Sequence, residues 1–232
     1  MRIHLAAANC GTLTVMTRTI VTLLALLPLH AAEFPLTSLD RLDIPAGTAA
    51  VTTYKGKSAL KLTDKNAGPN ESLALLKGVQ FHDGTIDVEL SGAPAKNADP
   101  TARGFIGIAF RIQPEPNHAE MIYIRPSNGR AADQLQRNHS TQYVSAPDWT
   151  WQRLRQETPG LYESYVDLQP GEWTRMRIVV KGKDASLYID GAEQPCLVVH
   201  NMKLGDVSGG VALWSGPGTE AYFRNLNITP AQ

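Results

Sequence analysis

The feature that most constrains the fold is a period-two alternation shared by three segments, residues 85–90, 104–112 and 121–125. In each segment, hydrophobic residues take every second position. Alternation of this kind predicts antiparallel strands that turn one face to a hydrophobic core and leave the other face open. The core face receives Ile86, Val88 and Leu90, then Ile106, Ile108, Phe110 and Ile112, and then Ile122 and Ile124.

The positions between these carry polar side chains around two very small residues. Gly107 and Ala109, in the middle segment, would leave a depression in the open face. If the three segments are neighbouring strands of one sheet, this face forms a polar groove. We expect it to carry Asp87, Glu89, Arg111, Tyr123 and Arg125.

The rest of the chain indicates more strands and frequent turns. Two alternating segments, 49–54 and 58–63, flank Lys55-Gly56-Lys57 and predict a hairpin. Further strands are expected at 72–76, 173–181, 185–190, 197–199, 210–214 and 221–228. No segment has a clear helical period, and no repeat of fixed length is visible. About twelve short strands predict an all-β domain, an antiparallel two-sheet jelly-roll sandwich.

Residues 126–171 form the longest region of weak alternation. It is well beyond the ~12–15 residues at which a structureless loop becomes unusual, and we expect short strands near 142–145 and 149–154. Ligand sites often lie on long loops carried by a rigid scaffold, although aromatic residues also build cores. The candidate binding residues of this region are Asp133, Gln136, His139, Trp149, Trp151 and Tyr162.

The first 32 residues have the pattern of a secretory signal peptide. A basic start at Met16-Thr17-Arg18 precedes an apolar run over 20–29, and small residues follow it. We expect translation to start at Met16, cleavage after Ala31 or Ala32, and a mature domain over 33–232. The run is about half of the ~20 residues that a membrane span needs, which leaves a short anchor as the alternative.

The charge and cysteine content of the chain limit its partners and its cross-links. The net charge is zero, with 22 basic and 22 acidic residues, and no basic stripe predicts a nucleic-acid partner. Cys10 lies in the signal segment, so Cys196 would have no internal disulfide partner.

We predict no metal or cofactor. No histidine has the spacing of a zinc ligand with another histidine or cysteine, and an oxygen-rich loop matches no calcium-binding motif. The histidines after the signal segment are His82, His118, His139 and His200, and the loop residues are Asp64, Asn66, Asn70 and Glu71.

Seven motifs in a fixed order carry a family resemblance. They are residues 81–89, 104–111, 123–126, 171–173, 187–191, 210–214 and 221–225. In this order they resemble the concanavalin A-like lectin/glucanase jelly roll. More narrowly, the chain is similar to secreted bacterial domains related to laminin G modules and to the 3-keto-disaccharide hydrolase family. The resemblance implies a curved sheet whose concave face holds sugar.

Asp87 and Glu89 are the candidate catalytic pair. Side chains at i and i+2 of a strand point the same way, and two rises of ~3.3 Å bring them within reach of one glycosidic bond. Family 16 glucanases place Glu, Asp and Glu on one strand face. Here either Thr85 occupies the first of these places or the last is missing. The alternative is that the two carboxylates pair with Arg111 or Arg125 across the sheet.

Arg111, Tyr123 and Arg125 could bind sugar hydroxyls or the carboxylate of an acidic sugar, because they combine fixed donors with a flat apolar ring. The sequence thus favours a secreted domain that binds carbohydrate. The alternatives are a glycoside hydrolase that acts on a disaccharide or polysaccharide, through a 3-keto-sugar in one version, and a protein-binding adhesion module of the laminin G type.

Overall fold

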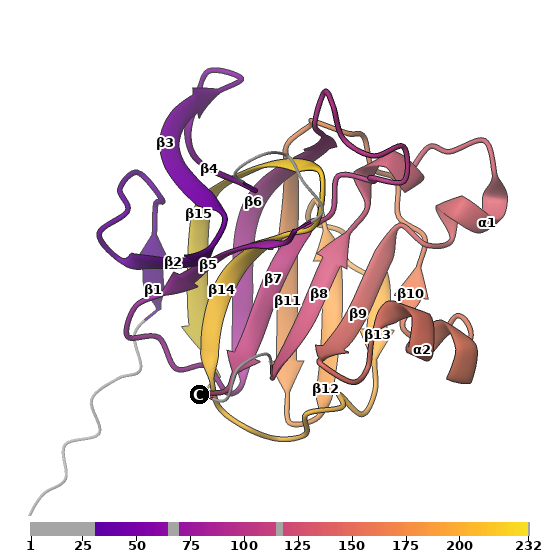
Figure 1. Cartoon of the computed structure of the whole chain (residues 1–232). Coiled ribbons are helices and arrows are strands. Elements are labelled where there is room, and N and C mark those ends of the chain that lie inside the picture. The colour runs from indigo at the N-terminus through magenta and orange to yellow at the C-terminus, as the bar shows by residue number, and fades with distance from the viewer. Residues whose placement is uncertain (1–30, 65–69, 115–117, 232) are drawn as a thin grey trace, which may run out of the picture.

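The computed structural model describes residues 31–64, 70–114 and 118–231, and two antiparallel sheets account for most of them (Figure 1). Sheet A contains β1 (Ala32–Phe34), β3 (Thr48–Tyr54), β4 (Lys57–Thr63), β6 (Gly84–Pro94), β11 (Thr174–Lys181), β12 (Asp184–Ile189), β13 (Leu197–Val199) and β15 (Thr219–Pro230). Sheet B contains β2 (Leu42–Ala46), β5 (Ser72–Leu76), β7 (Ile106–Ile112), β8 (Ala119–Ile124), β9 (Thr141–Ala146), β10 (Glu163–Ser164) and β14 (Gly210–Ser215).

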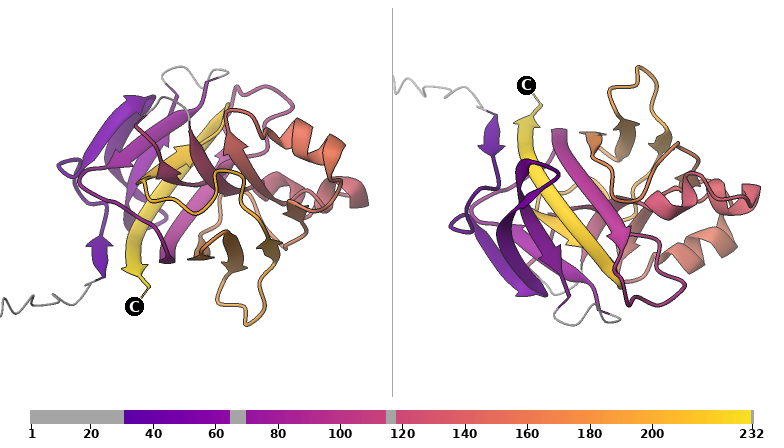
Figure 2. Two further views of the ribbon diagram at one scale, coloured as in Figure 1. Left: turned by 90° about the horizontal axis from the view of Figure 1, so that it is seen from below. Right: turned by 90° about the horizontal axis from the view of Figure 1, so that it is seen from above.

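The strand order is β13-β12-β11-β6-β15-β4-β3 in sheet A and β10-β9-β8-β7-β14-β5-β2 in sheet B. In sheet A, β1 pairs with the C-terminal half of β15. Figure 2 shows the long strands β6 and β15 side by side across the molecule, where they pair over most of their length. The all-β sandwich expected from the alternation is therefore confirmed, and so is the hairpin formed by β3 and β4.

The core lies between the sheets and contains the predicted hydrophobic positions. One buried cluster contains Ile86 and Leu90 of β6 together with Ile108 and Phe110 of β7, and all four residues are fully buried. Ile122, Ile124, Ile178 and Val180 are buried with them. Strand parity was thus correct for these strands, because it depends only on the local alternation.

The expectation that the three organising segments are neighbours in one sheet is wrong. β6 lies in sheet A between β11 and β15, whereas β7 and β8 lie in sheet B. Residues 95–105 carry the chain from one sheet to the other. The open side of β6 therefore faces away from the open sides of β7 and β8.

A second correction concerns the end of β7. Arg111 has φ of 52°, and the pairing of β7 with β14 shifts register between Gly210 and Val211. The extra residue of such a bulge shifts the alternation by one position. Ile112 consequently packs on the outer face of sheet B instead of in the core.

The region after β8 contains helices as well as strands. It includes the 3₁₀ turn η1 (Pro126–Asn128), helix α1 (Gln134–Arg137), strand β9 and helix α2 (Trp151–Glu157). The strand expected near 142–145 is confirmed as β9. The strand expected near 149–154 is wrong, because Thr150 caps a helix there by accepting a hydrogen bond from the Arg153 N–H.

The signal segment falls largely outside the described residues, since these begin at residue 31. β1 starts at Ala32, which pairs with Ile228. Within the described part of the chain, no helix is long and apolar enough to cross a membrane.

Candidate functional site

A hollow of about 630 Å³ opens on the outer face of sheet B. It lies at the end of the sheet where β8 gives way to the loops and helices of residues 126–171, which occupy the right-hand side of Figure 1. Aromatic side chains and two carboxylates form much of its lining. The lining residues are Glu71, Asp99, Thr101, Ala102, Phe105, Tyr123, Trp151, Trp214, Pro217 and Gly218.

One row of paired residues crosses sheet B beneath this hollow. Register places Trp214 opposite Gly107, Gly107 opposite Tyr123, Tyr123 opposite Gln142, and Gln142 opposite Glu163. Directly paired residues point to the same face of a sheet. Along this row the side chains change from aromatic at β14 to charged at β10.

Gly107 is required in the middle of this row. A Cβ at this position would lie 2.3 Å from the carbonyl oxygen of Ile122 and 2.6 Å from Cα of Tyr123. With no side chain between them, the rings of Tyr123 and Trp214 approach to 4.9 Å between centroids. The depression expected at Gly107 is thus filled from both sides by aromatic rings.

The floor of the hollow is held in place by specific contacts. Phe105 meets Tyr123 edge-on at 6.4 Å, and Trp214 Nε1 donates to Glu71 Oε2 at 3.0 Å. Trp151 differs from these residues, because its side chain is 39% exposed and lies under the guanidinium of Arg155, 4.8 Å from it. The floor therefore consists of aromatic rings packed against one another, and Trp151 is the exposed residue beside it.

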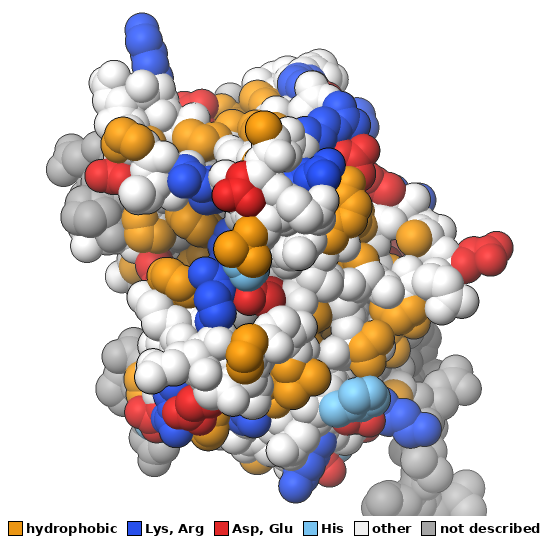
Figure 3. All heavy atoms as spheres, turned by 90° about the vertical axis from the view of Figure 1, so that its right-hand side faces the viewer, with side chains coloured by type: hydrophobic (Ala, Val, Ile, Leu, Met, Phe, Trp, Pro, Cys, Tyr) orange, Lys and Arg blue, Asp and Glu red, His pale blue; other side chains and the backbone are white. Residues whose placement is uncertain are grey.

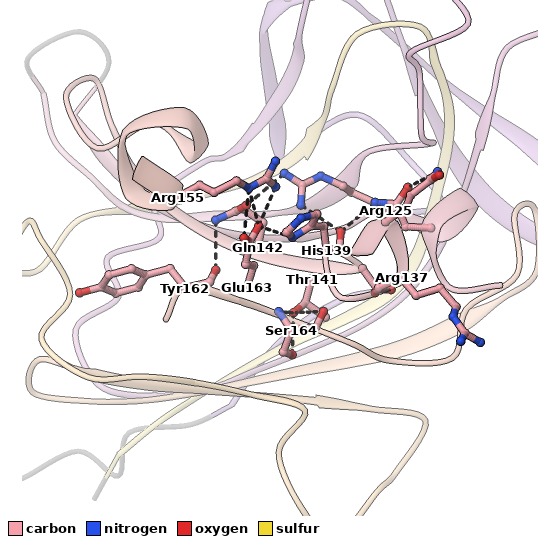
Figure 4. A network of polar contacts seen from close by, with 12 residues as sticks. Arg125, Arg137, His139, Thr141, Gln142, Arg155, Tyr162, Glu163 and Ser164 are labelled. Carbon is pink, nitrogen blue, oxygen red and sulfur yellow. Dashed lines mark hydrogen bonds and ion pairs between the residues drawn. The ribbon is translucent and has the colours of Figure 1, made fainter. Parts of the chain in front are cut away.

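Arg125 supports the aromatic floor from its charged side. Its guanidinium donates to the hydroxyl of Tyr123 (3.0 Å), to Oε1 of Gln142 (3.1 Å) and to the carbonyl of His139 (3.0 Å) (Figure 4). Burial lowers the pKa of Arg125, since the charged form loses its hydration. Gln142 and His139 thus hold the guanidinium of Arg125 in place, and the guanidinium positions the Tyr123 hydroxyl.

Glu163 completes the network that Figure 4 shows. Arg155 binds this buried carboxylate with both Nε and Nη2, the shortest contact being 2.7 Å, and Nδ1 of His139 lies 2.9 Å from it. Burial lowers the pKa of His139, although the nearby Glu163 opposes this shift. The network anchors the base of α2 to β10 and thereby places Trp151 over the hollow.

On the side of the molecule seen in Figure 3, acidic and basic side chains lie interspersed with hydrophobic ones.

Arg111 does not lie on the open face where the sequence places it. Its side chain is fully buried and points to one end of the sandwich, where it binds the carbonyls of His82 and Gly205 and the carboxylate of Asp83. The bulge in β7 causes this reorientation.

The other predicted ligand residues are divided. Tyr123 and Trp151 line the hollow, and Arg125 touches it through Tyr123. Asp133 caps α1 by accepting from the Leu135 and Gln136 N–H groups, and the side chain of Gln136 donates to Asn128. Trp149 packs on the core under Arg153 and Lys203.

Asp87 and Glu89 lie on the outer face of sheet A, on the opposite side of the sandwich. Asp87 accepts a hydrogen bond from Nε of Arg177 at 2.7 Å, and Glu89 accepts one from Asn225 at 2.7 Å. Lys57 and Arg224 approach Glu89 at 3.6 and 3.7 Å. The cross-strand pairing that the sequence left open as an alternative is present, but its cations come from β4, β11 and β15.

Two groups of side chains bear on metal binding. His82, Asp83 and Asp206 offer ligand atoms within 4.8 Å of one another, but the Arg111 guanidinium lies 3.0 Å from Asp83 and 3.7 Å from Asp206. A fixed positive charge inside such a cluster repels a cation.

The oxygen-rich loop is only partly described. Asn66 lies outside the described residues, and Asn70 donates weakly to Asp64 at 3.5 Å. Glu71 is bound to Trp214.

Of the ten lining residues, sequence reasoning named only Tyr123 and Trp151 as ligand candidates, and those it did not name include Glu71, Asp99, Phe105 and Trp214. Phe105 and Trp214 occupy outward positions of alternating strands, so parity could have found both. The two acids lie in loops, where alternation gives no direction.

Residues 47–229 match the family model of the 3-keto-alpha-glucoside-1,2-lyase-like domain. The chain belongs to this family. The resemblance to the 3-keto-disaccharide hydrolase family is thus confirmed. No curated protein has a significantly similar sequence.

Solved structures share the fold at low identity. A family 66 carbohydrate-binding module from Bacillus subtilis has a TM-score of 0.57 and 13% identity over 82% of this chain and 96% of that one. Peanut lectin has a TM-score of 0.57 and 11% identity over 86% and 96%. The lumenal domain of VIP36, bound to calcium and mannose, has a TM-score of 0.56 and 11% identity over 88% and 91%. These likenesses establish a lectin-like sandwich.

Proposed function

We propose that this domain binds a carbohydrate in the hollow on the outer face of sheet B. The observation that carries the proposal is the aromatic floor of Phe105, Tyr123 and Trp214, with Glu71 and Asp99 at its edge. The apolar surface of an aromatic ring suits the C–H face of a sugar ring, while a few fixed polar groups select its hydroxyls.

The family and the shared fold support this choice of ligand. The chain belongs to a family named for cleavage of a keto-glucoside, and its fold is shared with a carbohydrate-binding module, a lectin and a mannose-bound domain. With the signal pattern of residues 1–32, this supports an exported protein that works in the periplasm or outside the cell.

Trp151→Ala tests the binding site with little risk to folding, because this side chain is already 39% exposed. A glycan array would first identify a ligand, and calorimetry would then compare affinities. We expect Kd to rise about tenfold or more, which corresponds to about 1.4 kcal/mol.

Tyr165→Ala is the matched control. Tyr165 is a 46% exposed aromatic residue that does not line the hollow, so its loss should leave Kd unchanged. Equal affinity of wild type and Trp151→Ala for every glycan bound would exclude this hollow as the site.

Cleavage of a keto-sugar glycoside is the second candidate, and the family match favours it. Asp87 and Glu89 stay the predicted catalytic carboxylates, and both line a separate hollow on sheet A. Asp87→Asn and Glu89→Gln should each abolish release of reducing sugar from a 3-keto-disaccharide, since both remove proton transfer. Asp184→Asn, an exposed carboxylate of β12, is the control. Undiminished turnover in both variants would exclude the pair.

A further inference from the structure

A hollow of about 820 Å³ lies on the outer face of sheet A. We propose that this face is a second carbohydrate-binding surface, separate from the sheet B hollow, and that it takes a neutral, extended saccharide. The inference goes beyond binding in the sheet B hollow, and it does not depend on cleavage by Asp87 and Glu89, the second candidate function of this same hollow. The two surfaces lie on opposite sides of the sandwich and can be tested one at a time.

The floor of this hollow consists of ion-paired side chains that can still form further hydrogen bonds. The side chains of Asp87, Arg177 and Glu89 are 30%, 53% and 25% exposed. Arg177 and Asp87 bind each other through Nε and Oδ1 at 2.7 Å. A guanidinium has five donors and a carboxylate has about four acceptor positions, so both groups can still bind hydroxyls.

A bulge in β15 adds amide groups to this floor. The pairing of β15 with β6 shifts register between Arg224 and Asn227, and Asn225 has φ of 50°. Phe223 and Leu226 remain in the core, so Arg224 and Asn225 both turn outward, and Asn227 follows them on the same face. An amide donates and accepts at once, which suits a hydroxyl group. Bulges that re-aim side chains are common beside functional sites.

The charges around the hollow indicate a neutral ligand. Asp87 is balanced by Arg177, and Glu89 by Lys57 and Arg224. The rim adds two further acids, Glu33 and Glu193, and one further cation, Arg175, so the acids are in excess there. Rim acids repel a uronic acid or a phosphate, whereas they accept hydrogen bonds from neutral sugar hydroxyls.

An aromatic strip continues from the hollow across the same face. Lys57 and Arg224, the cations beside Glu89, lie 5.8 and 6.0 Å from the ring of Trp173. Trp173 contacts Tyr54 edge-on at 5.7 Å, and Tyr54 stacks on Tyr222 at 3.8 Å. All three rings are half-buried and have apolar surface beside donors. An oligosaccharide with one unit in the hollow would lay its next units along these rings.

The tryptophans allow each surface to be observed separately. Trp173 lies on the outer face of sheet A, and Trp214 forms the floor of the sheet B hollow. The protein would be labelled with 5-fluorotryptophan, and the two ¹⁹F resonances assigned with Trp173→Phe and Trp214→Phe. Hexasaccharides of glucose, mannose and xylose, and a hexasaccharide of galacturonic acid, are the probes.

We expect a neutral hexasaccharide to shift the Trp173 resonance saturably, whatever the Trp214 resonance does. Arg177→Ala should raise the Kd read at Trp173 about tenfold or more and leave the Kd read at Trp214 unchanged. Lys181→Ala is the matched control, because it removes an exposed cation from the same face of β11 outside the hollow.

The outcomes separate the two proposals. A response at Trp214 with none at Trp173 overturns the second surface and leaves the proposed function intact. A response at Trp173 alone supports the second surface and contradicts the proposed function. If the galacturonic acid hexasaccharide binds at Trp173 as tightly as the neutral probes, the preference for a neutral ligand is wrong. If Arg177→Ala leaves the Kd read at Trp173 unchanged, the hollow is not where the saccharide binds. If no probe shifts either resonance, both proposed sites are wrong.

Discussion

Replacing Arg111 by methionine should destabilise the fold without a selective effect on glycan binding. Nε and Nη2 of Arg111 donate to the carbonyl of His82 at 3.1 and 3.0 Å, Nη1 donates to Gly205 at 2.6 Å, and Nη2 donates to Asp83 at 3.0 Å. One buried side chain thus joins the turn before β6 to the loop between β13 and β14.

The expected magnitude follows from these contacts. Methionine keeps most of the apolar volume but leaves two carbonyls without their donor. Breaking a buried charged pair costs about 3–5 kcal/mol. Summing every hydrogen bond would overcount, because Asp83 keeps its bonds to the Gly182 N–H at 2.9 and 3.1 Å. We therefore expect a loss of about 3–5 kcal/mol, a large part of the stability of a typical domain.

Urea unfolding gives the free energy, and calorimetry at low temperature gives the affinity of the folded protein. Arg130→Met is the control, since Arg130 forms an exposed pair with Asp167 and its loss should cost no more than about 1 kcal/mol. A loss below about 1 kcal/mol in Arg111→Met would refute the structural role. So would weaker glycan binding at unchanged stability, which would return Arg111 to the ligand-binding role that the sequence predicts.

Three further predictions concern a buried acid, the aromatic floor and the amino terminus. Burial raises the pKa of Glu120. The unfolding free energy of the wild type, relative to that of Glu120→Gln, should therefore be highest at low pH and fall as pH rises through the folded-state pKa. A difference in unfolding free energy that is constant or rises with pH contradicts this. Gly107→Ala should lower the free energy of urea unfolding by about 1–3 kcal/mol and weaken glycan binding, because the new Cβ displaces Tyr123. An unchanged unfolding free energy and an unchanged Kd would show that β7 and β8 can move apart to accept the methyl group. Amino-terminal sequencing of exported protein should begin at Ala32 or Glu33, and material that begins at Met1 or Met16 would contradict cleavage.

The alternation of residues predicted which side chains enter the core, but it could not predict which strands are neighbours. Parity is a local property, and Ile86 and Ile108 follow it. Partners are set by distant segments, since β6 pairs with β11 and β15 and not with the next strand in the chain. The same limit explains why Asp87 was grouped with Tyr123.

Backbone irregularities account for the other errors. Arginine rarely adopts positive φ, so nothing local in the sequence predicts a bulge at Arg111. Helix α2 has two turns and a single buried residue, Leu154, so it has too little periodicity to compete with the strand interpretation. Its capping residue, Thr150, was the one usable signal.

The separation of the two faces restricts any mechanism of cleavage. Packed sheets lie ~10 Å apart with a filled core between them, and Asp87 and Tyr123 point away from that core on opposite sides. One glycosidic bond therefore cannot contact both. If Asp87→Asn abolishes turnover, cleavage takes place on sheet A, and the aromatic floor of sheet B anchors a different part of the glycan. If turnover persists, the acid and base must be sought on sheet B, where Glu71 and Asp99 are the carboxylates that line the hollow.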